Sequence, residues 1–214
     1  MKITEITPAK GTRYTVFVDG EYWYILDVEI IAANQLQPGM EVTPEFLAQL
    51  KEQAERRKAR ERAFYLLSYR DHSRGELVEK LCKSVRLEIA EETADKMEGF
   101  GYLNDEDYAQ KLARELIQHK KYGDYRAKFE MKKRYLSDDL IDWAIALAKQ
   151  DCDPQDMIRE VVERKYLRYL GDRKGVQKVT NALVRMGHNY SDIKAVIREL
   201  REAYEFSDED ERIE

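Results

Sequence analysis

The sequence contains little of what sheet-rich, disulfide-linked or membrane proteins require. Only 4 prolines and 10 glycines occur among 214 residues, which favours long helices. The two cysteines, Cys82 and Cys152, stand far apart and have no metal-ligand spacing, so we expect reduced thiols of a cytoplasmic protein. No apolar run approaches the roughly 18 residues that span a bilayer, and no signal-peptide pattern opens the chain. We therefore expect a cytoplasmic protein that does not contact a membrane.

Motifs for catalysis are also missing. There is no phosphate-binding glycine loop, and no ligand spacing links the cysteines with His72, His119 and His188. The acidic runs at 104–107 and 138–139 fit helix capping instead. We expect no enzyme activity, no cofactor and no metal, and we interpret the three histidines as surface or partly buried residues without a role.

Charged residues, in contrast, are abundant and follow a pattern along the chain. They make up 37% of the sequence, and the net charge is −5. Residues 56–87, 109–134 and 158–198 each carry a net charge of +6, and the segments between and around them are negative. Basic blocks that recur about fifty residues apart indicate a repeat.

Apolar positions repeat in the same register. Ser73, Gly123 and Gly175 each precede two apolar or small residues spaced by four, which is the buried stripe of a helix. The aligned positions are Leu77, Ala127 and Val179, then Leu81, Met131 and Leu183, with Leu67, Ile117 and Tyr169 on a first helix and Met97, Ile145 and Ile197 on a third. The sequence therefore predicts an all-α fold of three tandem three-helix repeats in an elongated, curved array.

The N-terminal part of the chain differs in kind. Residues 14–18 and 22–25 are β-branched and aromatic, and Asp19-Gly20 between them is typical of a hairpin turn. A short helix is expected over 28–34, and Thr43-Pro44 begins the next helix. This small β-hairpin module could act as a lid, an added docking surface or a stabilising cap. The expected organisation is a hairpin/helix extension at 1–55, repeats at 56–107, 108–152 and 153–204, and an acidic tail at 205–214.

Helix ends support this division. Ser73-Arg74-Gly75-Glu76 is a capping box, Ser137 and Ser191 are expected N-caps, and Asp153-Pro154 begins the third repeat. The stretch 98–108, EGFGYLNDEDY, is interpreted as an elbow between repeats. There Gly99 or Gly101 takes the left-handed conformation, Phe100, Tyr102 and Leu103 pack the junction, and Asn104 caps the next helix with Asp107 at its third position.

The elbow also carries a family resemblance. GYLNDEDYA, residues 101–109, resembles the Gly-Tyr-Leu-(Asp/Asn)-Asp-x-x-(Phe/Tyr)-Ala signature of the RecX family, bacterial regulators of the RecA recombinase. Residues 63–70 and 73–81 are similar to the first-repeat pattern of that family, and residues 121–131 to its second-repeat pattern. The resemblance covers about 56–204. The chain departs from it at Tyr135, where the family usually has glycine, and at 186–188, where Met-Gly-His only approximates an Arg-Gly-aromatic ending.

The resemblance implies a function without chemistry. Family members are expected to bind along the groove of the RecA–DNA filament and to hinder strand exchange, ATP turnover and co-protease action. The partner implied is the RecA filament, with single- or double-stranded DNA as a further partner. No dimer element is evident, so we expect a monomer. The alternative is a sequence-independent DNA-binding protein that acts on recombination indirectly, because three-helix units with a basic second helix resemble helix-turn-helix modules.

Basic residues interleaved with aromatics in the second and third repeats are the candidate contact residues, since cations neutralise phosphate and rings stack on bases. They are Lys120, Lys121, Arg126, Lys128, Lys132, Lys133, Arg134, Arg164, Lys165, Arg168, Arg173, Lys174 and Lys178. Two other interpretations stay open: the tyrosines are core residues and the cations only solvate a helix face, or the charges pair between repeats.

Overall fold

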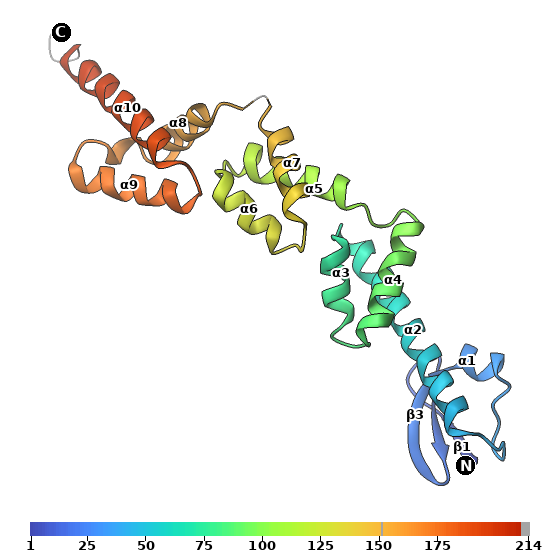
Figure 1. Ribbon diagram of the computed structural model, residues 1–214. Coiled ribbons are helices and arrows are strands. Elements are labelled where there is room, and N and C mark those ends of the chain that lie inside the picture. The colour runs from blue at the N-terminus through green and yellow to red at the C-terminus, as the bar shows by residue number, and fades with distance from the viewer. Residues whose placement is uncertain (151, 211–214) are drawn as a thin grey trace. The chain divides into compact units, whose positions relative to one another are not determined.

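The computed structural model describes the backbone of residues 1–150 and 152–210, and the side chains of 1–150 and 152–204. The described chain is mostly helical, with one small antiparallel sheet at its N-terminal end (Figure 1). It divides into two compact units. Unit 1 comprises 1–71 and 77–103, and unit 2 comprises 72–76 and the residues from Asn104 onward.

The sheet of unit 1 has three strands in the order β1 (Ile3–Pro8), β2 (Arg13–Val18) and β3 (Glu21–Asp27). The predicted hairpin is confirmed: Asp19 and Gly20 form its turn with φ of 51° and 87°, the left-handed values that a tight hairpin turn needs. Strand β1 was not predicted. Its sequence lacks a clear apolar alternation, and only Ile3, opposite Val18, is fully buried.

Two helices follow the sheet. Helix α1 (Val28–Ala33) is short, and α2 (Pro44–Tyr69) is long and continuous. The predicted cap of α2 is present, since the Thr43 hydroxyl accepts a hydrogen bond from the Phe46 amide at 3.2 Å. Helix α2 contributes to two hydrophobic cores. Leu47 and Leu50 pack against the sheet, and Ala59, Ala63 and Leu66 in its second half pack in the core of the first repeat.

The first repeat adds α3 (Arg74–Leu81) and α4 (Leu87–Gly99) to the second half of α2. The predicted stripe residues Leu77, Leu81 and Met97 are all buried, and Leu67 packs against them partly buried. Their burial confirms the helical register of this repeat.

The second repeat consists of α5 (Asp105–Arg114) with a π-helical turn η1 (Glu115–His119), then α6 (Asp124–Lys132) and α7 (Asp138–Ala148). Its predicted stripe residues form one buried cluster, namely Ile117, Ala127, Met131 and Ile145. Ser137 caps α7 as expected, accepting from the Leu140 amide at 3.4 Å.

The third repeat contains α8 (Pro154–Lys165), a short 3₁₀ turn η2 (Leu167–Tyr169), α9 (Arg173–Arg185) and α10 (Tyr190–Asp210). Val179, Leu183 and Ile197 are buried as predicted. Asp172 caps α9 by accepting a hydrogen bond from the Gly175 amide at 2.8 Å. The alignment with Ser73 and Gly123 placed Gly175 just before this helix, but α9 begins at Arg173 and includes Gly175. Tyr169, expected on the first helix, lies on η2 because α8 ends at Lys165.

The elbow is confirmed in its backbone and partly wrong in its packing. Gly101 has φ of 77°, Asn104 accepts from the Asp107 amide at 3.0 Å, and Leu103 is buried. Phe100, by contrast, is 66% exposed, and Tyr102 is also exposed, with its ring edge-on to that of Phe64 at 5.5 Å. Of the three, only Leu103 is buried, and it lies in the core of the first repeat.

Two further expectations are wrong. The cap of α10 is Asn189, whose side chain accepts from the Ser191 amide at 3.0 Å, because the helix begins at Tyr190. His72 and His188 are buried, and His188 has a structural bond described below. The acidic tail at 205–214 lies outside the described side chains, although the backbone of α10 continues to Asp210.

Candidate interaction surface

The candidate basic residues of the second repeat lie in two different environments. The first is a contact between the second and third repeats, inside unit 2. The Gly123 amide donates to the Met186 carbonyl at 2.9 Å, and the His188 ring nitrogen Nε2 lies 2.9 Å from the Lys121 carbonyl. Because a carbonyl only accepts, Nε2 carries the proton. Burial lowers the pKa of His188 from its ordinary value and favours this neutral form.

Glycine is required on both sides of this contact. A Cβ on Gly123 would overlap the backbone of Gly187, and a Cβ on Gly187 would overlap the backbone of Arg126. Gly187 also has φ of 87°, which a side chain disfavours. Lys121 belongs to the same contact, since its ammonium group pairs with Glu160 at 2.7 Å and lowers the pKa of that carboxyl. Lys121 therefore has a structural role.

A second contact of the same kind joins the end of α6 to the first turn of α3, again inside unit 2. The Ser73 hydroxyl donates to the Arg134 carbonyl, and the Arg134 guanidinium pairs at 2.9 Å with Glu76, whose side chain is only 6% exposed. A Cβ on Gly75 would overlap that of Tyr135. Arg134 is thus held by a buried carboxylate. Charge pairing between repeats, one of the two alternative interpretations, applies to Lys121 and Arg134.

The remaining cations of α6 lie on its exposed face, together with the ring of Tyr125, which the sequence pattern included, and that of Phe129, which it did not. Tyr125 is 76% exposed and Phe129 is 51% exposed. Lys133 and Arg126 approach the Phe129 ring at 4.3 Å and 5.6 Å, so the face combines cation and ring in direct contact. We call Tyr125, Arg126, Phe129, Lys132 and Lys133 the α6 face. The i, i+4 spacing of Tyr125 and Phe129 was the signal available in the sequence.

Cations in this region also have carboxylate partners. Lys132 pairs with Asp138 at 2.8 Å, and Arg126 and Lys133 share Glu130 at 2.6 Å and 3.8 Å. Lys128 pairs with Asp142, which raises the pKa of that lysine, and Lys120 pairs with Glu115, which lowers the pKa of that carboxyl. These pairs are exposed, and exposed ion pairs contribute only about 0–1 kcal/mol. A partner can therefore replace them at small cost.

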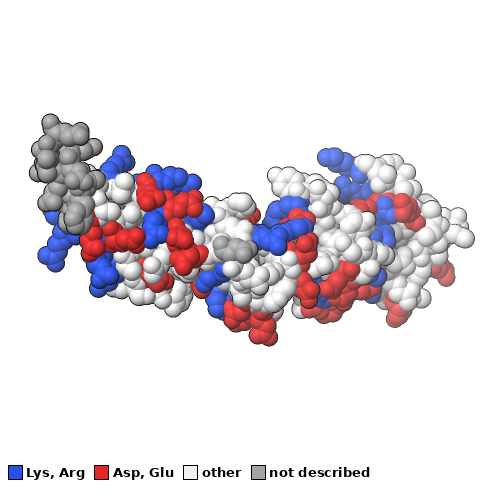
Figure 2. All heavy atoms as spheres, turned by 90° about the horizontal axis from the view of Figure 1, so that it is seen from above, with Lys and Arg blue, Asp and Glu red and all other residues white. Residues whose placement is uncertain are grey.

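The candidate residues of the third repeat surround Tyr169. Arg168 and Lys178 approach its ring at 4.9 Å and 4.8 Å. Arg173, Lys174 and Lys178 line a shallow hollow of about 540 Å³ beside this ring. Among the described residues, no carboxylate lies within ion-pair distance of Arg164, Lys165, Arg173 or Lys174. Figure 2 shows acidic side chains next to basic ones on the face it presents, so basic groups occur in local patches.

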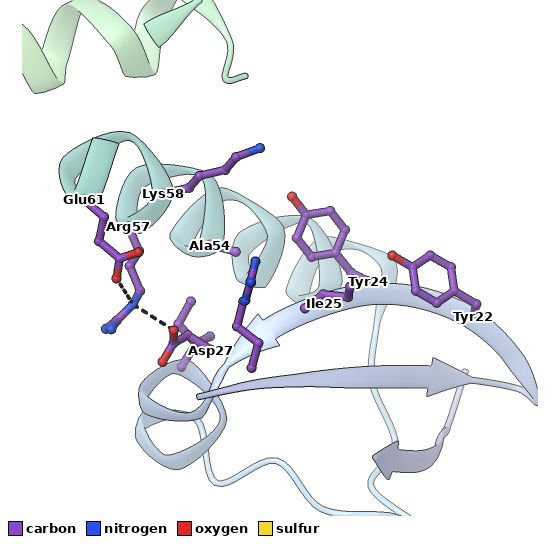
Figure 3. Close-up of a pocket in the computed structure, with 10 residues that line it drawn as sticks. Tyr22, Tyr24, Ile25, Asp27, Ala54, Arg57, Lys58 and Glu61 are labelled. Carbon is purple, nitrogen blue, oxygen red and sulfur yellow. Dashed lines mark ion pairs between the residues drawn. The ribbon is translucent and has the colours of Figure 1, made fainter. Parts of the chain in front are cut away.

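A cluster of ionic contacts in unit 1 lies between the sheet and α2. A pocket of about 310 Å³ there is lined by Tyr22 and Tyr24 of β3 and by charged residues of α2. Figure 3 shows the Arg57 side chain between two carboxylates, 3.4 Å from Asp27 and 3.0 Å from Glu61. Arg57 also pairs with Glu29 of α1, so its pairs with Asp27 and Glu29 link α2 to the end of β3 and to α1. These links support the interpretation of the N-terminal module as a stabilising cap.

The described residues offer neither a metal site nor a membrane span. In this part of the chain, no group of three His, Cys, Asp or Glu side chains is arranged to hold a metal ion. No helix within these residues has the length and hydropathy to cross a bilayer. Cys82 is exposed, Cys152 is half-buried, and both are free thiols.

These observations define a class of protein, the tandem three-helix repeat proteins. In this one, neighbouring repeats contact each other at glycine residues and carry exposed patches of basic and aromatic side chains. Two family models match it, one described as RecX, first three-helix domain, over 59–97, and one as RecX, second three-helix domain, over 104–145. The chain is therefore similar to the RecX family over these two segments.

Relatives extend the match over most of the chain. A protein of Caldanaerobacter subterraneus subsp. tengcongensis named Regulatory protein RecX is 28% identical, covering 92% of this chain and 98% of its own. One of Clostridioides difficile with the same name is 25% identical, covering 92% and 95%. A crystal structure of a regulatory protein RecX shares the fold with a TM-score of 0.62 at 22% identity, covering 91% of this chain and 98% of its own. RecX from Lactobacillus salivarius gives 0.59 at 24% identity, covering 68% and 96%.

Proposed function

We propose that this protein is a non-enzymatic regulator that binds the groove of the RecA–DNA filament and inhibits its recombinase, ATPase and co-protease activities. Similarity over most of the chain to proteins named Regulatory protein RecX supports this proposal. The observation that carries it is the α6 face, where exposed Tyr125 and Phe129 lie among exposed cations. Such a face suits a phosphate backbone or an acidic protein surface.

Repetition supports a polymeric target. The second and third repeats each present a basic-aromatic patch, on α6 and around Tyr169. Two patches on one chain bind a repetitive partner more tightly than either alone, because the second contact forms within the same complex. Binding by matched charge and shape requires no reactive group and no cofactor.

The α6 face can be tested by reversing its two exposed lysines, Lys132→Glu together with Lys133→Glu. We expect inhibition of RecA-dependent ATP hydrolysis to weaken about tenfold, with helicity by circular dichroism unchanged. Arg134 is left intact, since reversing it would place a second carboxylate beside buried Glu76. The matched control is Lys10→Glu with Lys83→Glu, two exposed lysines of unit 1 with the same change of net charge. Unchanged inhibition by the α6 variant would remove this face from the site.

The alternative is a sequence-independent DNA-binding protein that affects recombination indirectly. The cation–ring contacts of Phe129 and Tyr169 favour this candidate, because stacking platforms beside cations bind single strands without sequence preference. It predicts equal affinity for bare and for RecA-coated single-stranded DNA.

A further inference from the structure

The sheet of unit 1 has an open edge at β3. The strand order β1-β2-β3 leaves one side of β3 without a neighbouring strand. Among the described residues, no loop and no side chain hydrogen-bonds to the backbone of residues 22–26. Because every second residue of an edge strand points its amide and carbonyl groups away from the sheet, β3 has backbone groups free to pair with another strand.

The opposite edge of the sheet is protected. The Ile3 amide of β1 donates to the Met40 carbonyl at 2.9 Å, and the Gly39 amide donates to the Ile3 carbonyl at 2.8 Å, so a loop covers the start of that strand. Strand β1 also ends at Pro8, whose nitrogen carries no hydrogen to donate. Proteins use such loops and prolines to keep sheet edges from pairing with other chains.

Strand β3 lacks this protection. Its sequence, EYWYILD, contains no proline or lysine, and residues 22–25 are aromatic or β-branched, which favours strand pairing. A bulge interrupts the ladder opposite Phe17, but residues 24–27 pair regularly with β2. The second half of β3 can therefore accept a fourth strand.

The open edge borders the groove of about 310 Å³ between β3 and α2. Tyr24 and Ile25 both line this groove, although successive side chains of a strand point to opposite faces of the sheet. The groove therefore runs beside the edge of the sheet and not over one face. Ala54 and Lys58 of α2 line its other side (Figure 3). A peptide in this groove would pair with β3 and contact the helix, as extended peptides do when they add to exposed sheet edges.

Two cations that line the groove are available to a ligand. Lys58 and Arg13 are exposed, and each donates a hydrogen bond to a backbone carbonyl, at 3.3 Å and 3.4 Å. Among the described residues, neither has a carboxylate within ion-pair distance. The carboxylates of the groove, Asp27 and Glu61, both already pair with Arg57. A carboxylate of a ligand thus finds two cations without a carboxylate partner, whereas a cation of a ligand finds only paired carboxylates.

We propose that β3 binds an extended, acidic segment of a partner protein, which adds to the sheet as a fourth strand and places a carboxylate on Lys58. Backbone pairing supplies affinity, and Lys58 and Arg13 select acidic side chains. A second copy of this chain fits less well, because full antiparallel pairing of two β3 strands would place Glu21 opposite Asp27 twice. The site lies in unit 1 and does not depend on the role of the α6 face.

The first test measures binding of a fluorescein-labelled peptide, Val-Glu-Val-Glu-Val-Glu-Val, to the full chain by fluorescence anisotropy. The protein has a net charge of −5, so general electrostatics disfavour this peptide and binding must be local. We expect saturable binding with a Kd of about 100 μM or tighter, and its absence would overturn the proposal. Lys58→Glu should weaken binding about fivefold. The matched control is Arg62→Glu, on the same helix but outside the groove, where its side chain lies over the Tyr65 ring at 5.1 Å. Equal affinities of the two variants would also overturn the proposal.

A second test separates strand pairing from charge. Two versions of the peptide are compared, one N-methylated at its valines and one at its glutamates. Along an extended strand these two sets of amide groups point to opposite sides, and only one side pairs with β3. One version should therefore lose binding at least about tenfold while the other keeps most of it. Equal affinities of the two versions, whether high or low, would overturn strand addition.

Two further measurements test the occupant. We expect the full chain to sediment as a monomer, and the labelled peptide to stay bound when a single-stranded oligonucleotide is added at equal concentration. A dimer that the peptide dissociates would assign the edge to a second copy of the chain. Displacement by the oligonucleotide would assign the groove to nucleic acid. Either result would overturn a partner protein as occupant.

Discussion

Tyr135 lies directly against Gly75, so that no side chain fits at residue 75: a Cβ placed there would overlap the Tyr135 Cβ and lie 3.2 Å from the Tyr135 carbonyl oxygen. The same arrangement recurs between Gly187 and Gly123. In both cases, the residue that follows the second helix of one repeat packs on the start of the second helix in the repeat before it. Tyr135 follows α6 and packs on α3, and Gly187 follows α9 and packs on α6. This relation explains the glycines at these positions.

We predict that Gly75→Ala destabilises unit 2 although alanine favours helix. The added methyl group forces the α3 turn away from Tyr135, and overpacking of this kind costs about 1–3 kcal/mol. The control is Gly99→Ala, where nothing lies within 4 Å and a gain of up to about 1 kcal/mol is expected. Chemical denaturation measures both, and a stabilising Gly75→Ala would contradict the contact.

A second prediction concerns Tyr135 itself, which occupies the left-handed region with φ of 59°. The corresponding residue in the third repeat is Gly187, with φ of 87°, and the RecX resemblance also leads one to expect glycine at 135. We expect Tyr135→Gly to change the free energy of unfolding by no more than about 1 kcal/mol, because relief of backbone strain offsets the removal of the ring. Tyr135→Val should cost about 1–2 kcal/mol more than Tyr135→Gly, since β-branched residues disfavour this conformation most.

The matched pair for this test is Tyr125→Gly and Tyr125→Val, at an exposed position inside α6. There the order should reverse, with glycine the less stable, because helical φ removes the advantage of glycine. The same order at both positions would show that strain at residue 135 is not the cause.

The repeats were predictable from sequence because their information is local. Each repeat has two buried residues spaced by four, which marks a buried helix face whatever the tertiary contacts are: Leu77 and Leu81, Ala127 and Met131, and Val179 and Leu183. Thr43, Asn104 and Asp153 were recognised as caps for the same reason, since a cap acts within three residues. Strand β1 was missed because its pairing with β2 fixes it more than its own pattern does.

The candidate site was predicted less well, because the role of each basic residue depends on carboxylates that are far away in the sequence. Lys121 and Arg134 look like the other cations in sequence, yet Glu160 and Glu76 hold them between repeats. No local pattern shows these pairings. Phe129 was overlooked because an exposed and a buried aromatic look alike on a helix, and only its exposure separates it from a core residue.

A third prediction concerns pH. Burial lowers the pKa of His188 below its ordinary value of 6.5, although Asp124 of α6 and Asp192 of α10 oppose the shift. The unfolded chain therefore binds a proton at a higher pH than the folded one, so this residue stabilises the fold above pH 6.5 and loses that contribution as pH falls. We expect unfolding midpoints to drop more between about pH 7.5 and 5.5 for the parent than for His188→Gln. An equal drop would show that His188 is not responsible.

A fourth prediction concerns ionic strength. If the α6 face and the patch around Tyr169 neutralise charges on the filament, the affinity should fall steeply with added salt. Replacing Lys132 and Lys133 should reduce the slope of this dependence by about one for each phosphate that is no longer neutralised. Titrations at several salt concentrations measure it. A slope that is the same in the parent and in this variant would place the binding surface elsewhere.

The central claim is that the protein recognises an assembled recombinase filament and not DNA alone. The most direct measurement compares its affinity for RecA-coated single-stranded DNA with its affinity for the same DNA without RecA, at one salt concentration. We predict binding at least about tenfold tighter to the coated strand, together with inhibition of ATP hydrolysis by the filament. Equal affinity for the two, or tighter binding to bare DNA, would contradict the claim.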